Sequence, residues 1–411
     1  MRGVAKWLVM TVVAALAGCA AQAGRPVSDF RDLQANDVLA KVGWQYYWSM
    51  PSPSFFQPGE SVERLYRVGD AVCTLTNHNR LIAYEASTGR VRWSLVVAPE
   101  GQDVFEPVFV KDMSLHETVP GLKTIVDSDT APMARLFDAV VVGMRNSVIV
   151  INAMTGHVVR DEATGRFKDV SSGASGCADA KRYYGVTAKG LCFAFDLDAG
   201  IHIWNFGGYS GVVAPLREFG GQVFLGNRAG EIMAAQADKS RNLNWMRSIP
   251  EQILAPFSIS KRGLFVAGEE GGVYAFEPFG GKPMWQEPFY CKGRLIDPIQ
   301  VSGRTVFQHA EGDTFYAISL VDGKKRWTMK DGRLVLAIVG DDACVLDSRR
   351  VLHVVNEETG KEKWALPLTG MDVFLPGTGT EGIWAATRDG RVVCLRPLAA
   401  GRLTLDKLEA P

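Results

Sequence analysis

Leu81–Leu95 reads Leu-Ile-Ala-Tyr-Glu-Ala-Ser-Thr-Gly-Arg-Val-Arg-Trp-Ser-Leu. An alternating apolar run leads into a turn at Ser87–Arg90, and a second run then reaches Trp93. Apolar runs of period two on either side of a glycine-containing turn are typical of a β-hairpin. Gly89 allows the positive φ of a tight turn. Trp93 offers a large flat surface that can wedge against a neighbouring sheet, and its full burial contributes roughly 4–5 kcal/mol.

This hairpin is repeated along the chain. Three further copies keep a glycine followed four residues later by a tryptophan: Gly281 and Trp285, Gly323 and Trp327, Gly360 and Trp364. Three weaker copies keep part of the pattern: Gly200 with Trp204, Arg241 with Trp245, and Gly156 with Arg160. Apart from one step of 67 residues, successive turn positions are 37 to 44 residues apart. A period of about 40 made of short strands predicts a β-propeller with one four-stranded sheet per blade.

The two ends of the chain are predicted to share one blade. Trp44–Met50 matches the strand around Trp93, but its own blade is missing on the N-terminal side. Two strand-like runs at the far end of the chain, residues 382–387 and 391–395, belong to a blade that this strand can complete. The N-terminal strand is therefore expected to close the ring. No long segment has a 3.6-residue period, so the mature chain is predicted to be all-β.

Eight docking positions predict eight blades. Tryptophan occupies seven of them, and these residues are assigned a structural docking role: Trp48, Trp93, Trp204, Trp245, Trp285, Trp327 and Trp364. Arg160 occupies the eighth position. A seven-bladed ring with an extra C-terminal hairpin is the alternative, because Gly401–Leu405 could itself supply the outer strand of the last blade.

The N-terminus has the features of an export signal. Two basic residues precede an apolar run, Trp7–Leu16, that is too short to span a bilayer. The run ends in Leu-Ala-Gly-Cys19, which resembles the bacterial lipobox, in which the cysteine becomes the lipidated first residue of the mature chain. An ordinary secretory signal cleaved near Ala17 is the alternative. Ala20 stands where retention in the inner membrane would favour Asp, and this indicates the outer membrane.

These features divide the chain into four parts: a lipoprotein signal peptide at 1–18, a lipidated tether at 19–43, the propeller at 44–405 and a C-terminal tail at 406–411. The one long step between turn positions is explained by an insertion at 111–133. Insertions in propellers lie on one face, often the binding face. A surface excursion without a role is the alternative.

Charge argues against nucleic acid as a partner. The chain has 45 Lys and Arg against 45 Asp and Glu, and loss of residues 1–18 removes two of the basic residues. A protein that follows a phosphate backbone shows a basic stripe. No basic block is present in this sequence.

No pattern in the chain indicates a catalytic, cofactor or metal site. Six cysteines follow Cys19, and several occupy equivalent strand positions of different blades, which favours buried free thiols, with disulfides as the alternative. The six histidines are scattered without metal-ligand spacing. Residues 377–382, Gly-Thr-Gly-Thr-Glu-Gly, match a dinucleotide pattern but lead into a strand, so they lack the helix N-terminus that would hold a pyrophosphate.

The repeat Leu-x-Ala-x-x-x-x-Thr-Gly-x-x-x-Trp, seen at residues 81–93, resembles the tryptophan-docking repeat of the pyrroloquinoline-quinone (PQQ) propeller superfamily. The resemblance covers Trp44–Leu395. One branch contains PQQ-dependent dehydrogenases, which carry a vicinal cysteine pair and calcium-ligating acids around the cofactor. The other contains the outer-membrane assembly lipoprotein BamB, an eight-bladed scaffold. No two cysteines are adjacent here, and the lipobox, the closing strand and the length resemble the BamB branch.

The resemblance implies a non-enzymatic, lipid-anchored propeller at the outer membrane, facing the periplasm, with a BamB-like accessory role in outer-membrane protein assembly. Its expected partner is the outer-membrane β-barrel assembly machinery, within which the chain is expected to be monomeric. No cofactor is expected. Two alternatives remain: a surface module that binds glycans or other ligands at the ring's central mouth, and a PQQ-dependent oxidoreductase.

Overall fold

The computed structural model describes residues 38–115, 135–145, 147–163, 176–187, 190–207, 211–238, 243–312, 314–368, 370–379 and 382–404. The predicted signal peptide, the lipidation site Cys19 and the C-terminal tail lie outside these ranges, as does most of the predicted insertion. Nearly all of the regular secondary structure in the described residues is β-strand. Their helix α2 (Val38–Lys41) has four residues, and no helix in these ranges is long and apolar enough to cross a membrane.

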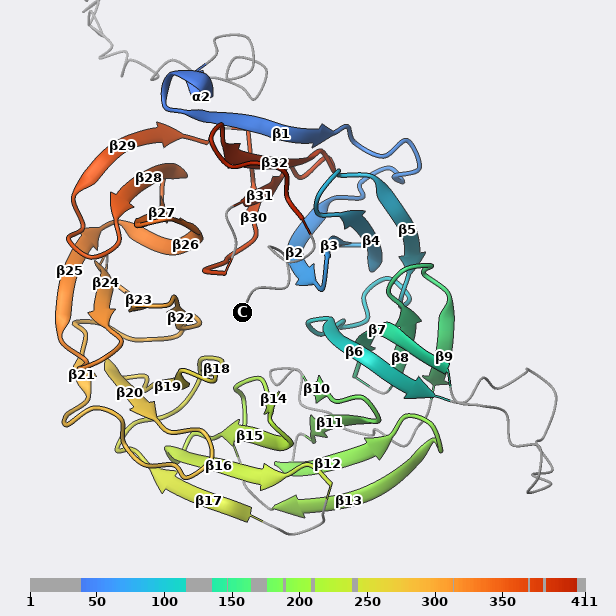
Figure 1. Ribbon diagram of the computed structural model, residues 1–411. Helices are drawn as coiled ribbons and strands as arrows, with labels where there is room; N and C mark the ends of the chain where they lie inside the picture. The colour runs from blue at the N-terminus through green and yellow to red at the C-terminus, as the bar shows by residue number, and fades with distance from the viewer. Residues whose placement is uncertain are drawn as a thin grey trace, which may run out of the picture.

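The strands form eight antiparallel sheets of four strands that stand as blades around a ring, with the first strand of a blade at the inner edge and the last at the rim (Figure 1). Blade 1 is β2 (Val62–Val68), β3 (Ala71–Thr76), β4 (Arg80–Glu85) and β5 (Val91–Val96). Blade 2 is β6 (Val108–Leu115), β7 (Arg135–Gly143), β8 (Ser147–Asn152) and β9 (Val158–Ala163). Blade 3 is β10 (Cys177–Ala178), β11 (Arg182–Val186), β12 (Leu191–Asp196) and β13 (Ile201–Gly207). Blade 4 is β14 (Arg217–Phe219), β15 (Gln222–Gly226), β16 (Glu231–Gln236) and β17 (Leu243–Ser248).

The second half of the ring follows the same order. Blade 5 is β18 (Ser258–Ser260), β19 (Gly263–Ala267), β20 (Gly272–Phe276) and β21 (Phe289–Tyr290). Blade 6 is β22 (Gln300–Val301), β23 (Thr305–Ala310), β24 (Thr314–Ser319) and β25 (Lys325–Lys330). Blade 7 is β26 (Gly332–Val339), β27 (Asp342–Asp347), β28 (Val351–Asn356) and β29 (Glu362–Pro367). Blade 8 is β30 (Val373–Phe374), β31 (Ile383–Ala386), β32 (Val392–Pro397) and, from the other end of the chain, β1 (Trp44–Met50).

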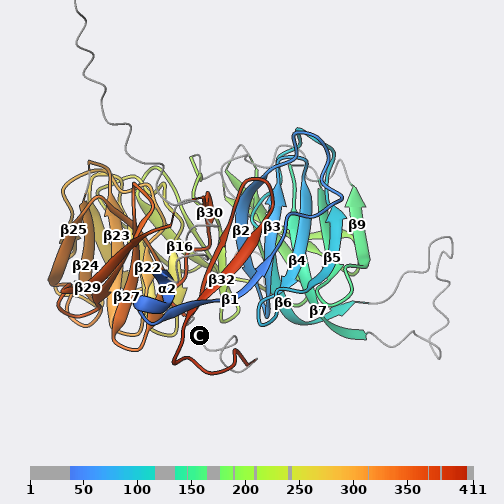
Figure 2. The ribbon, with the colours of Figure 1, turned by 90° about the horizontal axis from the view of Figure 1, so that it is seen from above.

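Blade 8 closes the ring with both ends of the chain, as the sequence predicts. β1 pairs with β32 in an antiparallel register that runs from Trp44 opposite Pro397 to Met50 opposite Val392 (Figure 2). The described part of Gly401–Leu405 forms no strand, so the N-terminal strand is the outer strand of the last blade. The prediction of eight blades is confirmed, and the seven-bladed alternative is wrong.

The core consists of eight apolar clusters, one at each junction between neighbouring blades. Because each sheet is covered on both faces, its two middle strands are mostly buried and consist largely of apolar residues. β15 and β19 are examples, with every residue buried. Alternation of apolar and polar side chains survives chiefly on the outer strands, such as β17, where only Trp245 is buried.

Seven blades of the described ring carry a register shift in the outer strand immediately before the docking position. In blade 1, Trp93 lies opposite Ala83 and Val91 lies opposite Tyr84, so that Arg92 is the extra residue. A β-bulge of this kind increases the local twist and re-aims the next side chain. The repeated bulge therefore accounts for how the docking side chains of these seven blades turn toward the following blade.

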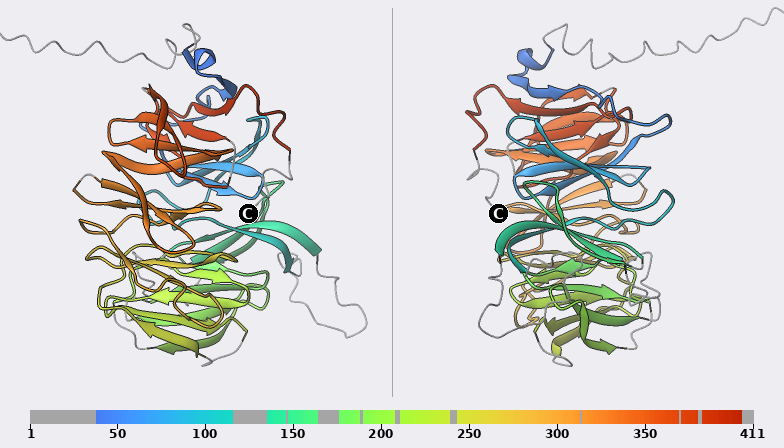
Figure 3. Two further views of the ribbon diagram at one scale, coloured as in Figure 1. Left: turned by 60° about the vertical axis from the view of Figure 1, so that its left-hand side comes forward. Right: turned by 90° about the vertical axis from the view of Figure 1, so that its right-hand side faces the viewer.

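Two predicted boundaries overlap the described residues. Residues 111–115 of the predicted insertion are the last part of β6, which pairs with β7 as a hairpin that projects beyond the disc (Figure 3). Residues 38–43 of the predicted tether include α2, whose Leu39 is buried against blades 7 and 8. Both segments are therefore attached to the ring more closely than their irregular sequence indicates.

Candidate functional site

The docking tryptophans join consecutive blades by a hydrogen bond as well as by packing. Six of them are at least nine-tenths buried, and each donates its indole N–H to a backbone carbonyl in the turn between the third and fourth strands of the next blade. The donor–acceptor pairs and their Nε1–O distances are Trp48 and Ala86 (2.9 Å), Trp93 and Ala153 (2.8 Å), Trp204 and Ala237 (3.2 Å), Trp245 and Pro278 (2.9 Å), Trp285 and Leu320 (2.9 Å), and Trp327 and Glu357 (2.8 Å).

The turn glycine of the next blade completes this arrangement. Gly156 has a φ of 73°, and a Cβ atom at this position would lie 2.5 Å from the Cβ of Trp93. Gly360 stands in the same relation to Trp327, with a φ of 68° and a nearest distance of 2.6 Å. The glycine is thus required twice, for the left-handed backbone and for the close approach of the indole.

Arg160 takes the place of tryptophan at the junction between blades 2 and 3. Its side chain is 8 % exposed, and its Nη2 lies 3.0 Å from both the carbonyl oxygen and the carboxylate Oδ1 of Asp198. Asp198 lies in the turn between β12 and β13, which corresponds to the turn that accepts the indole N–H elsewhere. Arginine therefore reaches the same acceptor region as tryptophan and adds an ion pair.

Trp364 differs from the other six tryptophans because the next blade has no turn at this place. Blade 8 joins β32 to β1, which are the two ends of the chain, so no glycine turn connects its outer strands. Trp364 is half-buried and packs edge-on against Trp44, with 5.8 Å between ring centroids and 76° between the planes. The sequence repeat predicts the same surroundings for Trp364 as for the other six docking tryptophans, and the structure shows that they differ.

Two contacts at the inner edge of the ring join blades that are not neighbours. Arg217 of blade 4 forms an ion pair with Glu106, which precedes β6 in blade 2, at 3.2 Å. Thr378, which follows β30 in blade 8, donates from Oγ1 to the carbonyl of Val301 in blade 6 at 2.6 Å. Thr378 belongs to residues 377–382, the stretch that matches a dinucleotide pattern, and here it links the inner strands of two blades. The repeat pattern of the sequence predicted neither of these two contacts.

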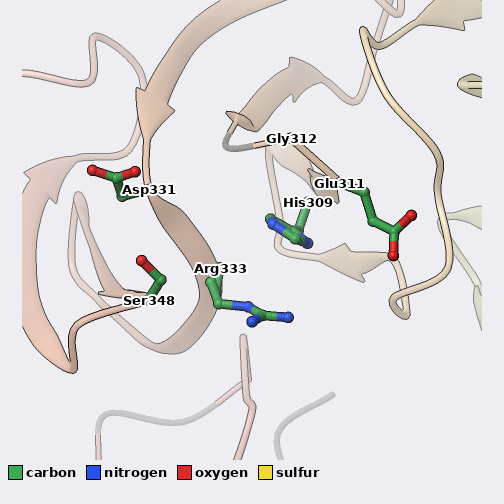
Figure 4. Close-up of a pocket in the computed structure, with 6 residues that line it drawn as sticks. All are labelled: His309, Glu311, Gly312, Asp331, Arg333 and Ser348. Carbon is green, nitrogen blue, oxygen red and sulfur yellow. The ribbon is translucent and has the colours of Figure 1, made fainter.

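A polar cavity of about 320 Å³ lies between the loops of blades 6 and 7 (Figure 4). Its lining residues are His309, Glu311, Gly312, Asp331, Arg333 and Ser348. His309 Nδ1 and Asp297 Oδ2 are 2.6 Å apart, and Arg333 Nη2 lies 3.7 Å from the same oxygen. The hydrogen bond with His309 holds the pKa of Asp297 below its usual value.

The cavity is lined by polar and charged side chains. Side chains of both signs of charge line it, and in Figure 4 the side chain of Arg333 extends away from Ser348. None of the six lining residues is Phe, Tyr or Trp, and the imidazole of His309 is the one aromatic ring among them.

The six cysteines after Cys19 are free and buried in the described structure. Burial raises the pKa of Cys73, Cys192 and Cys291 to about 12, so these thiols are protonated at neutral pH. A protonated thiol is neither a nucleophile nor a metal ligand. Within the described ranges, no group of three or more His, Cys, Asp or Glu side chains is placed to hold a metal ion.

Known proteins that are similar to this chain support the propeller fold. Residues 41–251 and 230–373 match the family described as "Outer membrane protein assembly factor BamB". Among solved structures, the chain is similar to the crystal structure of BamB from Moraxella catarrhalis, with a TM-score of 0.62, 16 % identity, and coverage of 88 % of this chain and 99 % of that chain. It is also similar to the computationally designed Ika8 protein, with a TM-score of 0.60, 13 % identity, and coverage of 85 % and 99 %.

At these identities the structural likeness shows the fold alone, and no curated protein matches the chain significantly. The match to the family shows more than the fold, because it is a match of sequence. It covers most of the chain, including blades 1 to 7. The chain is a PQQ-like β-propeller, and it therefore belongs to the family of the outer membrane protein assembly factor BamB.

Proposed function

We propose that this protein is a non-enzymatic, lipid-anchored scaffold with a BamB-like accessory role in outer-membrane protein assembly. The observation that carries the proposal is the family match over residues 41–373, on a ring whose repeated residues are used to hold blade to blade. A rigid ring leaves its loops and outer strand edges available to other proteins, and such edges accept partner strands with little demand on sequence.

Anchoring through Cys19 at the outer membrane, on the periplasmic side, is part of the proposal. The described residues begin with α2 at Val38, which lies next to β1 at the rim (Figure 1). The residues between Cys19 and Val38 span about 60 Å when fully extended. A lipid at Cys19 would hold the ring within that distance of the membrane surface, where an assembly complex embedded in the membrane is within reach.

A non-enzymatic role is supported by the origin of the shifted pKa values. The thiols of Cys73 and Cys344 and the phenols of Tyr46 and Tyr183 have raised pKa values, and burial is the first cause in each case. Raised values keep these groups protonated and inert at neutral pH. These are packing groups of the blades, and the partner surface is proposed to lie on the outside of the ring.

Co-purification tests the proposal. The full lipidated chain, carrying a C-terminal affinity tag, is recovered from gently solubilised membranes, with its Cys19→Ser variant as the control for anchoring. The wild-type chain is expected in the outer-membrane fraction together with a β-barrel assembly protein, and the variant in the soluble periplasmic fraction. Recovery of the wild-type chain without such a partner contradicts the scaffold role. Dye reduction after reconstitution with PQQ and calcium contradicts the non-enzymatic role.

A further inference from the structure

The turns that join the third strand of a blade to the fourth all lie on one side of the disc, here called the turn face. They do so because every blade is antiparallel and follows the same strand order. The structure describes this turn completely in blades 1, 2, 3, 5, 6 and 7, and in each of them the N–H of the turn glycine donates to the carbonyl four residues earlier. Corresponding residues of these turns therefore occupy equivalent places on the turn face.

Three of these turns expose a large apolar side chain at the tip, two residues before the glycine. These tip residues are Met154 (58 % exposed), Phe279 (55 %) and Val321 (79 %). The other three turns have polar residues at this position: Ser87, Asp198 and Glu358. Since the same turn forms with either kind of residue, its backbone does not require an apolar tip. Single exposed apolar side chains are common, but their recurrence at one position of one face indicates a site for another molecule.

The turn face also carries basic side chains, two of them in the same turns as Phe279 and Val321. The residue immediately after the glycine is basic and exposed in four of the six turns: Arg90, Lys282, Lys324 and Lys361. Arg90 lies 3.9 Å from Glu85, and Lys324 lies 3.5 Å from Asp322, yet these two basic side chains remain 79 % and 82 % exposed. Exposed ion pairs are weak, so these cations stay available to an anionic ligand.

The chain enters the ring on the turn face. β1 is the fourth strand of blade 8, so it begins on the side where the fourth strands of the other blades begin. α2 directly precedes β1, and the carbonyl of Gly43 between them accepts the N–H of Leu398, which follows β32, at 2.8 Å. In Figure 2, where the ring is seen edge-on, α2 lies at the lower side of the disc. The lipid proposed at Cys19 would thus be connected to the ring at the turn face.

We propose that the turn face binds an anionic lipid surface. Met154, Phe279 and Val321 enter the boundary between headgroups and acyl chains, and the basic residue after each turn glycine contacts the headgroups. This inference rests on the proposed function, because the anchor at Cys19 brings this face to the membrane. Basic residues beside exposed apolar side chains are the combination by which peripheral proteins bind anionic bilayers.

The placement of the three tip residues favours a lipid surface over a protein partner. They belong to blades 2, 5 and 6, which lie in different parts of the ring (Figure 1). A flat surface can meet turns of one face in all three blades at once. A compact partner protein centred on one or two neighbouring blades would leave at least one of these side chains in water.

The test uses the chain from residue 19 onward with Cys19→Ser, here called the parent chain, which lacks the signal peptide and the lipid but keeps the whole ring. Flotation with vesicles of phosphatidylethanolamine and phosphatidylglycerol measures binding. Phe279→Ser and Val321→Ser are each expected to weaken binding about five- to tenfold, because an apolar side chain no longer leaves water. Phe55→Ser, 44 % exposed in the loop between β1 and β2 on the opposite side of the disc, is the matched control and should bind like the parent chain.

Serine is a suitable replacement because Ser87 occupies the tip position in blade 1. The melting temperature of each variant checks that the ring is intact. The contribution of charge is tested by Lys282→Gln, which is expected to weaken binding about fivefold. Lys330→Gln, at the end of β25 on the opposite side of the disc, is its control and should have no effect. Vesicles of phosphatidylcholine alone should bind the parent chain more weakly.

Three results would each overturn the proposal: no binding of the parent chain to the anionic vesicles, equal binding by both tip variants, or equal binding of the parent chain to phosphatidylcholine. All three leave the scaffold function standing, since that is judged by recovery of an assembly protein with the lipidated chain. If the tip variants reduce that recovery while vesicle binding is unchanged, the turn face binds a protein and the proposal is wrong. If the lipidated wild type recovers no assembly protein but the vesicle results are as expected, the scaffold function fails and the lipid-binding face stands.

Discussion

The junction between blades 1 and 2 and the junction between blades 2 and 3 solve the same problem with different side chains. At the first, the indole of Trp93 packs on Gly156 and donates to the carbonyl of Ala153. At the second, the guanidinium of Arg160 donates to the carbonyl and the carboxylate of Asp198. Both side chains are long and planar and end in an N–H donor.

The comparison shows that the docking position requires shape and a donor more than it requires an aromatic ring. Tryptophan stabilises its junction mainly by removing apolar surface from water. Arginine is well suited to buried ion pairs, since its planar fork of donors is weakly hydrated, but charge must be desolvated at both partners. The tryptophan junctions should therefore be the more stable ones, and the arginine junction the one that responds to salt.

The largest expected effect is the loss of a docking indole. Trp93→Ala is expected to lower the free energy of unfolding by about 3–5 kcal/mol, because it opens a cavity and leaves the carbonyl of Ala153 without its donor. Trp48→Ala, at the junction that closes the ring, should cost the same amount. Urea unfolding of the chain expressed without its lipid measures both. An unchanged midpoint for either variant contradicts the docking role.

The glycine side of the tryptophan junction should be nearly as sensitive. Gly156→Ala is expected to destabilise the protein by about 2–4 kcal/mol, because a left-handed backbone and a clash with Trp93 are combined. Gly340→Ala is the matched control, since Gly340 has a φ of 58° but no neighbouring atom within 4 Å of the place that a Cβ would take. The control should lose about 1–2 kcal/mol. Equal losses in thermal unfolding would show that the indole contact contributes nothing.

Truncation of the arginine should cost less than truncation of the tryptophan. Arg160→Ala is expected to lower the free energy of unfolding by about 1.5–3 kcal/mol, the range for hydrogen bonds to charged groups. Arg160→Lys keeps the charge but not the planar fork, and should recover only part of the loss. Urea unfolding compares the two variants. A loss larger than that of Trp93→Ala would reverse the ranking of the junctions.

Removal of charge alone should have a smaller effect at the arginine junction. Asp198→Asn keeps the backbone carbonyl and an amide oxygen, so a loss of about 0.5–1 kcal/mol is expected. The difference from wild type should shrink at an ionic strength of about 1 M because salt screens the pair. Trp93→Ala, measured in parallel, should show no such salt dependence. A salt-independent effect of Asp198→Asn would mean that the ion pair is not what the junction uses.

An effect as small as that of Asp198→Asn concerns an ion pair beside Trp93. Arg92 holds the pKa of Asp70 below its usual value through two hydrogen bonds of 2.6 and 2.5 Å. A lowered pKa contributes stability that is present above the unfolded-state value of about 4 and is lost as the pH falls through the folded value. Wild type should exceed Asp70→Asn by about 0.5–1 kcal/mol at pH 7. Unfolding at pH 7 and pH 3 checks this: a difference that grows on acidification contradicts the assignment.

Most of the ring could be predicted because the residues that identify each blade lie close together in the sequence. A glycine and a tryptophan four residues apart report one hairpin and one contact with the next blade, as at Gly323 and Trp327. The bulge that aims each tryptophan was not predicted, since it depends on pairing between strands. The partner of Arg160 was also missed, because Asp198 belongs to another blade and no tryptophan marks the contact.

The amino-acid order by itself determined the all-β repeat, the eight blades and the closure of blade 8 by both ends, because these follow from periodic glycine and aromatic positions and from counting them. Only the tertiary structure decided which blades meet across the inner edge, as Arg217 and Glu106 do, and which outer strands leave apolar side chains exposed. Those properties arise from the curvature of the ring and from what each docking side chain leaves uncovered. No local pattern encodes them.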